Sequence, residues 1–520
     1  MIGIKQLPNA KKVNIQYNLC QAKGPDGKIM TKQRSQFVAE TNTHESSAAE
    51  FWSSIEHLRG HLEVAEYKHL VLGILYLKSV LTMPNKKLPC DDPLADTLIE
   101  IRSKLWKNVL NSASTPLLAA ALAAAYEAIS ENMPGVFHST AINRESIARL
   151  LCLVDGLGAN PSHNPIPDIF MFCLDKFNQA EGKRASEFYT PDSLIDLLVK
   201  TAAPSEGRIY DPCCGTGGLL IRACEHSGIG GPRLLPYGQE SNPSTWCICK
   251  MNLAIRGIQC DIGSQPKDSL NSSPYSDFSA DYILANPPFN ADNWTSEPPP
   301  ERKWEFGIPP ASNANFAWIQ HIFRHLSPGG TAVFTMGNGA LSSNTCGEGE
   351  IRRRMIEADV VDCIIALPPN LFHSTRIPAS VWVLAENKGG GVYRGCKSRD
   401  RRHQTLFIDA RRMGVMANRI HRVLRASEIN EIATAYRAWR GSIGASYMDV
   451  AGFSRSCGKR EIEAAHFVLN PGRYVGSDLS IGADESPHEK IEFLTRQLDE
   501  QFKESIRLRH LISERMGRIG

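Results

Sequence analysis

From about Gly182 onward, short strand-like runs alternate with amphipathic helical patterns, and this alternation constrains the fold more than any other feature. The strand-like runs are apolar or β-branched and end at turn residues. They read RIYDPCCG, LLPYGQES, DYILANPP, TAVFTMG, VVDCIIALPP, SVWVLAEN and TLFIDA. Strands that alternate with helices predict an α/β fold, a mostly parallel sheet with helices on both faces. Because such sheets bind ligands beyond the carboxyl ends of their strands, we expect the chemistry there.

The rest of the chain has a different character. Residues 1–44 are polar and basic, which predicts a flexible N-terminal extension. Residues 45–182 carry apolar residues at helical spacing without strand signals, which predicts a helical domain. The alternating region spans 183–425, and residues 426–520 are expected to be helical again.

The C-terminal segment HEKIEFLTRQLDEQFKESIRLRHLI has one apolar stripe on an otherwise charged helix. The stripe consists of Ile491, Leu494, Leu498, Phe502 and Leu508. Such a helix packs either on the core of its own chain or against a partner helix, and the pattern leaves both open.

Composition excludes several classes of protein. The 520 residues are 42% hydrophobic and 22% charged, as in ordinary soluble globular proteins. No apolar run reaches the ~20 residues of a transmembrane helix, so no membrane association is expected. The N-terminus has no secretory pattern. None of the 14 cysteines forms a CxxC pair, which favours reduced thiols in the cytoplasm over zinc or disulfides.

The first motif with chemical content is DPCCGTGG, from Asp211 to Gly218, between a strand and a helix. The glycines Gly215, Gly217 and Gly218 flank Thr216 and allow a sharp turn with close approach of a ligand to the backbone. The motif is neither a P-loop nor the six-residue dinucleotide pattern. An acid at the strand end suits a cationic or amine-bearing ligand, and a purely structural turn is the alternative.

Two further acids follow in positions typical of nucleoside recognition. Glu240 ends the next strand, where an acid commonly accepts hydrogen bonds from the ribose hydroxyls of an adenosine cofactor. Asp268 ends another predicted strand, and its carboxylate is placed to accept an adenine amino hydrogen. The pattern alone does not separate this role for Asp268 from a structural one.

An aromatic segment precedes the glycine motif. In ASEFYTPDSLIDLLV, we expect Thr190 to be the N-cap of a helix and Pro191 its first residue. Phe188, Tyr189 and Thr190 are then placed to close over the amino-acid end of a cofactor.

The fifth motif is Asn286-Pro287-Pro288-Phe289, which follows the strand-like run DYILA. The Asn286 side-chain carbonyl and the Pro287 backbone carbonyl are two acceptors for the hydrogens of one amino group. Phe289 offers a flat face on which a base can stack. We therefore expect a target with an NH2 group on a ring, methylated chiefly by positioning and preorganised dipoles.

Two other patterns are weaker. His321 and His325 stand four residues apart, as metal ligands on a helix do, but the glutamate of a zinc-protease helix is missing. We interpret them as ordinary, partly exposed histidines and expect no metal. The run YRGCKSRDRRHQ, residues 393–404, is densely basic and is either a solvated loop or a contact to phosphates.

The order of these motifs resembles that of the amino-methylating DNA adenine methyltransferases. The closer resemblance, over about residues 45–475, is to the modification subunit of type I restriction-modification systems. It rests on LRGHLEVAEYKHLVLGILYLK in the helical region and on EFYTP, DPCCGTGG, NPPFN, GIPPASNANFAWIQHIFRHLSPGG and EGEIRRRMIEADVVDCIIALPPNLFHSTRIPASVWVLAENK in the catalytic region.

This resemblance implies a Rossmann-like class I methyltransferase domain with a seven-stranded sheet. It also implies that S-adenosylmethionine donates a methyl group to N6 of adenine in double-stranded DNA. The cofactor-binding residues would be Phe188, Tyr189, Thr190, Asp211, Gly215, Thr216, Gly217, Gly218, Glu240 and Asp268. The residues that grip the flipped base would be Asn286, Pro287, Pro288 and Phe289.

The resemblance also implies partners. A separate specificity subunit reads the DNA sequence, two modification subunits join it, and a restriction subunit can be added. The C-terminal helix is then a candidate docking element, and the basic run 394–402 a candidate DNA contact.

Two features depart from the family pattern: the first 44 residues, and the lack of an aromatic residue after NGAL in NGALSSNTCGEGE. Two other functions stay open at this point. One is methylation of glutamine side chains in proteins, which uses the same Asn-Pro-Pro-aromatic motif. The other is a catalytically silent assembly or DNA-clamping subunit.

Overall fold

The computed structural model describes most of the chain between residues 47 and 509. The described ranges are 47–59, 63–82, 93–113, 115–127, 144–157, 164–181, 190–228, 234–271, 277–292, 294–295, 304–372, 378–418, 421–476, 495–496, 498–499, 501–503 and 505–509. The predicted extension, residues 1–44, and the aromatic pair Phe188 and Tyr189 lie outside them. The chain forms two compact units, residues 1–57 and 58–520. In the first, residues 47–56 are helical.

Between residues 64 and 181 every described element is a helix. They are α2 (Val64–Thr82), α3 (Pro93–Ser112), α4 (Leu118–Glu127), α5 (Arg144–Asp155) and α6 (Ile166–Glu181), after the short 3-10 helix η1 (His57–Arg59). α2 is buried almost all round because α3, α5, α6 and α10 of the next region pack against it. Its two buried lysines are paired, Lys68 with Glu181 at 2.7 Å and Lys78 with Asp155 at 2.8 Å. Within the described part of the chain, each helix is too short or too polar to span a bilayer.

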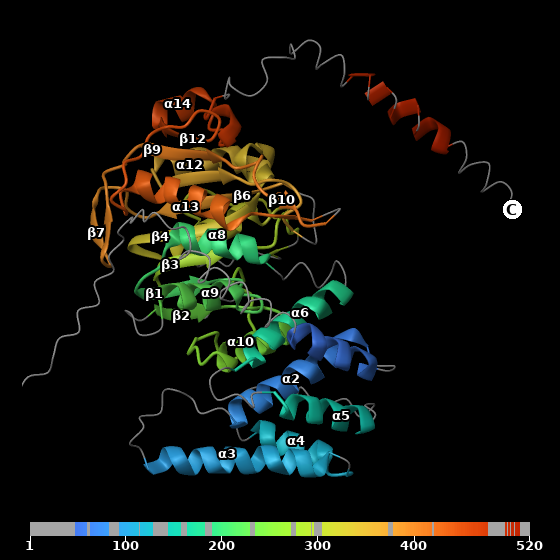
Figure 1. The fold of residues 1–520 in the computed structure, drawn as a ribbon. Coiled ribbons are helices and arrows are strands. Elements are labelled where there is room, and N and C mark those ends of the chain that lie inside the picture. Colours follow the sequence, from blue (N-terminus) through green and yellow to red (C-terminus); the bar gives the residue numbers. More distant parts are fainter. Residues whose placement is uncertain are drawn as a thin grey trace, which may run out of the picture. The chain divides into compact units, whose positions relative to one another are not determined.

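The predicted α/β architecture is confirmed by an eight-stranded sheet (Figure 1). Its order is β12 (Ser454–Gly458), β9 (Gln404–Asp409), β5 (Val361–Ala366), β6 (Ala379–Ala385), β4 (Leu326–Gly337), β3 (Ala280–Ala285), β1 (Gly207–Asp211) and β2 (Leu234–Gly238). Neighbours are parallel from β2 through β1 and β3 to β4, and again between β5 and β9. β6 and β12 run antiparallel to their neighbours.

The sheet differs from the expected seven strands by its edge strand β12. This strand comes from the region after residue 425, which was expected to be helical, and it pairs with β9 from Ser454 opposite Ile408. Its sequence, SRSCG, has no β-branched residues, so no strand signal was visible. Pairing with β9 is a tertiary effect that the local pattern does not encode.

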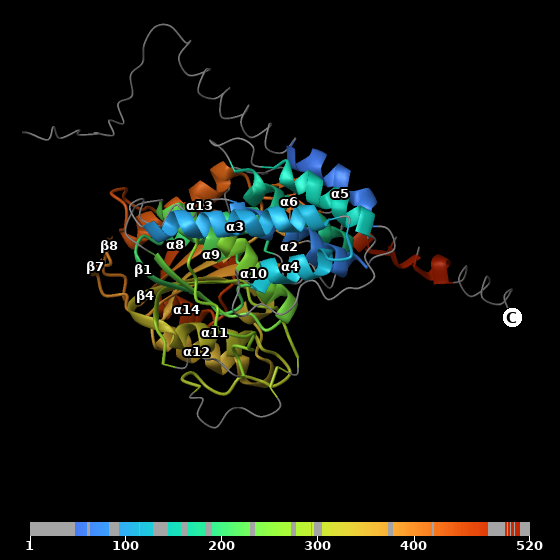
Figure 2. The ribbon, with the colours of Figure 1, turned by 90° about the horizontal axis from the view of Figure 1, so that it is seen from below.

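Helices α8 (Asp192–Ala202), α9 (Gly218–Ser227), α10 (Pro243–Ile255), α11 (Asn315–Arg324), α12 (Glu348–Glu357), α13 (Ala426–Arg440) and α14 (Lys459–Ala464) accompany the strands. α8 and α13 lie side by side, as both ribbon views show (Figures 1 and 2). The remaining elements are the hairpins β7 (Gly391–Tyr393) with β8 (Cys396–Ser398) and β10 (Val415–Met416) with β11 (Arg422–Val423), and the 3-10 helices η2 (Asn338–Leu341), η3 (Thr345–Gly347) and η4 (Pro471–Arg473).

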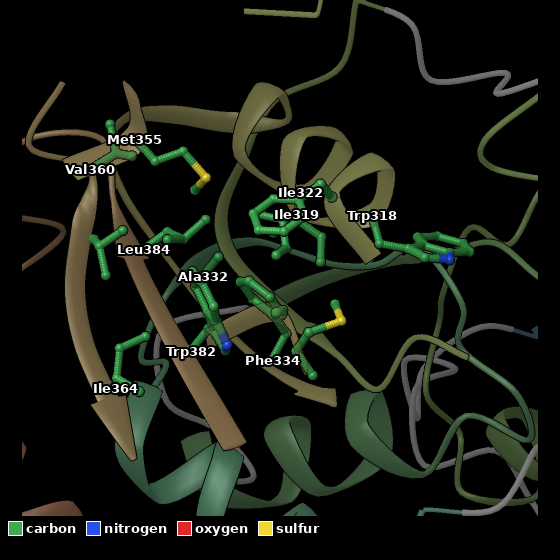
Figure 3. Packing of buried hydrophobic residues seen from close by; sticks show 14 of the residues in the cluster. Trp318, Ile319, Ile322, Ala332, Phe334, Met355, Val360, Ile364, Trp382 and Leu384 are labelled. Atoms are coloured by element: carbon green, nitrogen blue, oxygen red, sulfur yellow. The ribbon is translucent and has the colours of Figure 1, made fainter. Parts of the chain in front are cut away.

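A hydrophobic core lies between the sheet and the helices that cover it (Figure 3). Ile319 of α11, Phe334 of β4 and Trp382 of β6 all belong to this core and are fully buried. The Phe334 and Trp382 rings are nearly parallel, with centroids 6.4 Å apart. Burial of such side chains contributes roughly 1.5–3 kcal/mol each, which makes this layer the rigid base of the strand ends.

The basic run 394–402 was a candidate DNA contact, and the structure uses much of it internally. Arg401 is 1% exposed and pairs with the buried Asp362 at 2.8 Å. The Arg399 guanidinium lies 4.9 Å from the ring centroid of Trp439. Arg402 pairs with Asp400 within the same loop. The prediction was therefore wrong for Arg401, because a charged side chain buried with a counter-ion cannot reach a phosphate.

The two helical histidines also differ from their predicted exposure. His321 and His325 are 2% and 3% exposed, with ring centroids 4.2 Å apart. Both pack beside Tyr210 of β1. They are buried because α11 turns this face toward the sheet, an orientation that four-residue spacing does not reveal.

Candidate active site

The carboxyl ends of β2, β1, β3 and β4 meet at one edge of the sheet, where the described site residues come together. Asp211 ends β1 opposite Gly238 of β2, and its carbonyl accepts a hydrogen bond from the Gln239 N–H at 3.0 Å. Glu240 is the second residue after the end of β2. Asn286 is the first residue after β3. This is the sheet edge at which ligands bind in parallel α/β folds.

The glycine motif forms a tight turn from β1 into α9. Gly215 and Gly217 have φ angles of 54° and 86°, a left-handed conformation that favours glycine. Gly218 begins α9, and the Thr216 carbonyl accepts a hydrogen bond from the Asn252 side chain at 2.8 Å. Asn252 of α10 therefore holds the turn through the Thr216 carbonyl. The backbone of the turn can still bind a ligand at the start of α9.

Two buried carboxylates face this turn. Asp211 is 1% exposed and Glu240 5% exposed. Burial, with a contribution from the nearby Glu240, raises the pKa of Asp211 to about 7. Burial also raises the pKa of Glu240, although its carboxylate accepts hydrogen bonds from Gly215 N at 3.1 Å and Asn242 N at 2.7 Å. Two neighbouring buried carboxylates favour a ligand that carries positive charge and hydroxyl donors.

Asp268 occupies a different local structure from the predicted one. It is exposed and sits in a turn, not at the end of a strand. Its Oδ1 accepts from Leu270 N and its Oδ2 from the Asn271 side chain, both at 2.8 Å. A hydrogen bond of 2.9 Å from Lys267 N to the Glu240 carbonyl nevertheless holds this turn beside the carboxylates. The strand predicted to end at Asp268 does not form, because in the described segment before it only Asp261 makes a bridge to β2, opposite Tyr237.

Thr190 was predicted to cap helix α8, and that prediction was wrong. The cap position is Pro191, and no side chain caps the helix. The Thr190 hydroxyl instead accepts a hydrogen bond from Asn286 Nδ2 at 3.0 Å. On the other side, the hydroxyl of Thr335 in β4 donates to Asn286 Oδ1. Two threonines from distant segments therefore orient the Asn286 amide.

The loop that follows is held by a pair of asparagines. Asn290 has a left-handed φ of 52°. Its backbone N–H donates to Asn315 Oδ1 at 2.9 Å, and its own Oδ1 accepts from Asn315 Nδ2 at 2.8 Å. Asn315 is 1% exposed at the start of α11. This reciprocal pair anchors the loop to a helix that is itself packed on the sheet.

The remaining motif residues present an aromatic surface. Pro287 is buried and Pro288 exposed. The Phe289 ring is half-buried and meets Phe372 edge-to-face, with centroids 5.4 Å apart. An edge-to-face contact supports a ring without covering both of its faces, so Phe289 is suited to stacking.

Sequence reasoning missed Thr335, Asn290, Asn315 and Phe372. Thr335 had one signal, a hydroxyl in the middle of the otherwise apolar stretch AVFTM. Asn290 and Asn315 lie in NPPFN and SNANFAWIQ, where an asparagine before a helix reads as an ordinary cap. Phe372 lies in a loop with no local cue. Each contact joins segments far apart in the chain.

This chain is similar to known proteins in sequence and in fold. The N-6 DNA Methylase family matches residues 162–480. The methylase subunit of the type I restriction enzyme HindI from Haemophilus influenzae is 38% identical over 416 residues, covering 76% of this chain and 90% of that protein. The type I methyltransferase subunit from Streptococcus thermophilus has the same fold, with a TM-score of 0.67 at 21% identity over 83% of this chain and 99% of that one. A chain of a further type I R-M system has a TM-score of 0.56 at 17% identity over 91% and 99%. The chain therefore belongs to the N-6 DNA methylase family, as a type I restriction enzyme methylase subunit and adenine-specific DNA methyltransferase.

Proposed function

We propose that this protein is the modification subunit of a type I restriction-modification complex. In this role it transfers a methyl group from S-adenosylmethionine to N6 of an adenine flipped out of duplex DNA. The observation that carries the proposal is Asn286, held between Thr190 and Thr335 at the same sheet edge as the Asp211–Glu240 pair. One edge then holds both a cofactor cradle and an acceptor for an amino group.

The residues of the cradle fit S-adenosylmethionine. The buried carboxylates of Asp211 and Glu240 both have a raised pKa, so a cationic ligand with hydroxyl donors would relieve the cost of their ionisation. Glu240 would accept the ribose hydroxyls, and the Asp268 turn beside it would meet the adenine. The turn at Gly215 and Gly217 allows the cofactor to approach the backbone. When bound, the cofactor supplies an electrophilic methyl group.

The chain's own contribution to catalysis is to position the target nitrogen. Asn286 Oδ1 would accept one hydrogen of the adenine amino group while Thr335 keeps the carbonyl oriented, since a carbonyl oxygen has two lone pairs. Pro287 would accept the second hydrogen through its carbonyl, and Phe289 would stack on the base. Withdrawing the nitrogen lone pair from conjugation makes it the nucleophile. Fixed dipoles of this kind lower the barrier without a strong general base.

We further propose that sequence choice comes from a specificity subunit joined by two copies of this chain, with a restriction subunit as an additional partner. The C-terminal segment supports a docking role. Leu498, Phe502 and Leu508 of its predicted stripe are 46–58% exposed, while Ile491 and Leu494 lie outside the described residues. Exposed large apolar side chains at helical spacing are typical of a helix that packs on a partner. A DNA substrate places the complex in the cytoplasm.

The test is a methylation map of DNA from a host without adenine methylation. The host would carry this chain with its specificity subunit, either as wild type or as Asn286→Ala. N6-methyladenine at one split motif, lost in the variant, is the expected result. Unmodified DNA from an intact complex that binds S-adenosylmethionine would contradict methylation of DNA and favour the catalytically silent subunit.

A further inference from the structure

A cavity of about 310 Å³ lies at the opposite end of the sheet from the candidate active site. Its wall includes the last turn of α8, the end of α9, the first residues of β3 and β4, and the last turn of α13. Tyr282 lines it and Asn286 is four residues further along, about 13 Å away at the rise of a strand. The cavity is therefore a site separate from the catalytic one, and a volume near 300 Å³ is within the range of small-molecule pockets.

Three buried polar atoms on this wall have no hydrogen-bond partner within the part of the chain that the structure describes. They are Thr201 Oγ1, Arg437 Nε and Arg440 Nε. Thr201 is 1% exposed, and neither arginine side chain takes part in an ion pair with another described residue. A buried polar group without a partner destabilises the fold by roughly 1–3 kcal/mol, so three at one cavity require an explanation. All three can donate a hydrogen bond, which points to a ligand made of acceptors.

The charge balance favours an anion. The one acid on the wall, Asp281, is already engaged. It accepts from Arg208 N at 2.7 Å and Ser327 Oγ at 3.0 Å, and it pairs with Arg394 at 3.4 Å. Burial opposes its ionisation, but the hydrogen bond from Tyr393 and these contacts outweigh burial and lower the pKa of Asp281. Neither Arg437 nor Arg440 forms an ion pair with a described residue, and the buried Asp362, which interacts electrostatically with Arg440, is already paired with Arg401.

The carboxyl ends of α8 and α13 at this cavity have donors other than Arg437 and Arg440 for several of their carbonyls. Helix carboxyl ends carry partial negative charge, which attracts basic side chains. Some of these carbonyls have other donors: Ala203 N donates to Val199 O at 2.7 Å in α8, and Gly441 N donates to Ala438 O at 3.0 Å in α13. The Arg399 backbone and side chain take the carbonyls of the last two α13 residues. The Nε–H groups of Arg437 and Arg440 have no hydrogen-bond partner among the described residues.

We propose that this cavity binds a small phosphate-bearing molecule, whose phosphoryl oxygens accept hydrogen bonds from Arg437, Arg440 and Thr201. Two guanidinium groups on successive turns and one hydroxyl match a dianion with three terminal oxygens. Inorganic phosphate and a nucleoside 5′-monophosphate share this chemistry. The site does not depend on the methyltransferase function, because its residues are not those of the catalytic edge.

The test is isothermal titration calorimetry of the full-length chain with inorganic phosphate at pH 7.5, in parallel with adenosine 5′-monophosphate. To keep the catalytic edge out of the measurement, both titrations are repeated with saturating S-adenosylmethionine. We expect one saturable site that persists with the cofactor present. Tighter binding of the nucleotide would identify the ligand as a phosphate monoester, and equal or weaker binding would identify it as free phosphate.

Variants assign the binding to the cavity. The double variant Arg437→Gln, Arg440→Gln should weaken binding at least about tenfold, since each change removes a charge-assisted hydrogen bond. The double variant Arg412→Gln, Arg460→Gln removes the same charge at exposed positions and should change it less than about twofold. Thr201→Val is a second cavity variant in case the double variant does not fold. No saturable binding up to ~10 mM phosphate, or equal affinity in folded cavity and control variants, would overturn the proposal.

Discussion

Replacing Thr335 by valine tests whether the orientation of Asn286 is set by its neighbours. Thr335 is fully buried in β4, and its hydroxyl donates to Asn286 Oδ1. Valine has nearly the same shape, so Thr335→Val removes that hydroxyl and adds a methyl group in its place. The opposite contact, from Asn286 Nδ2 to Thr190 Oγ1 at 3.0 Å, is left intact. The Asn286 amide then keeps one of its two orienting hydrogen bonds.

Two effects of different size follow. Loss of a donor to a partly buried carbonyl should lower the free energy of unfolding by about 1–2 kcal/mol. Looser orientation of Asn286 should lower the rate of methyl transfer, because the carbonyl must point at the target amino group in the transition state. A loss of about 1.4 kcal/mol of transition-state stabilisation corresponds to a tenfold lower rate. S-Adenosylmethionine affinity should stay unchanged, since Asp211 and Glu240 are untouched.

The assay is single-turnover methylation of duplex DNA by the chain assembled with its specificity subunit, alongside urea denaturation. A matched control is Thr405→Val in β9, where a buried hydroxyl donates to Val361 O at 3.0 Å. Both variants should lose similar stability, but only Thr335→Val should lose rate. An unchanged rate in Thr335→Val would refute the reasoning, because the hydroxyl would then not orient the carbonyl. A faster rate would also refute it, because the threonine would then compete with the target amino group for the carbonyl.

Three further predictions follow from buried polar groups. Because burial raises the pKa of Asp211 to about 7, its ionisation destabilises the ligand-free fold as the pH rises from about 4 to 7. Asp211→Asn should therefore stabilise the protein by up to about 4 kcal/mol at pH 8 and little at pH 4, and equal melting shifts at both would contradict this. Asn315→Ala releases the loop at Asn290, so methyl transfer should fall roughly tenfold at unchanged cofactor affinity, and an unaltered rate constant would disprove the anchoring role. Asp362→Asn leaves Arg401 buried without a counter-ion and should reduce stability by about 3 kcal/mol at pH 7 in urea titrations. Burial opposes ionisation of Asp362, but Arg401 and Lys388 outweigh it and lower its pKa, so this difference should shrink below about pH 4 and a constant difference would count against it.

Much of the site could be read from short contiguous segments. The turn at Gly215 and Gly217 requires a left-handed backbone conformation. Because glycine adopts this conformation most readily, the glycines in the sequence predict the turn directly. Asn286 follows an apolar run that ends at two prolines, so the end of a strand was visible without the fold. Strand-helix alternation then predicted that such ends share one edge of a sheet. In each case the structural cause lies within a few residues of its effect.

Tertiary structure decided what depends on residues far apart in the chain. Thr190 reads as a helix cap, yet its hydroxyl serves Asn286, 96 residues away. Arg401 reads as a solvated charge, yet Asp362 holds it inside the protein. The strand Ser454–Gly458 has no strand signal of its own and exists because β9 offers it an edge. Local propensity and periodicity report what a segment prefers alone, whereas the energy of a buried hydrogen bond or ion pair depends on which partner the folded chain brings within about 3 Å.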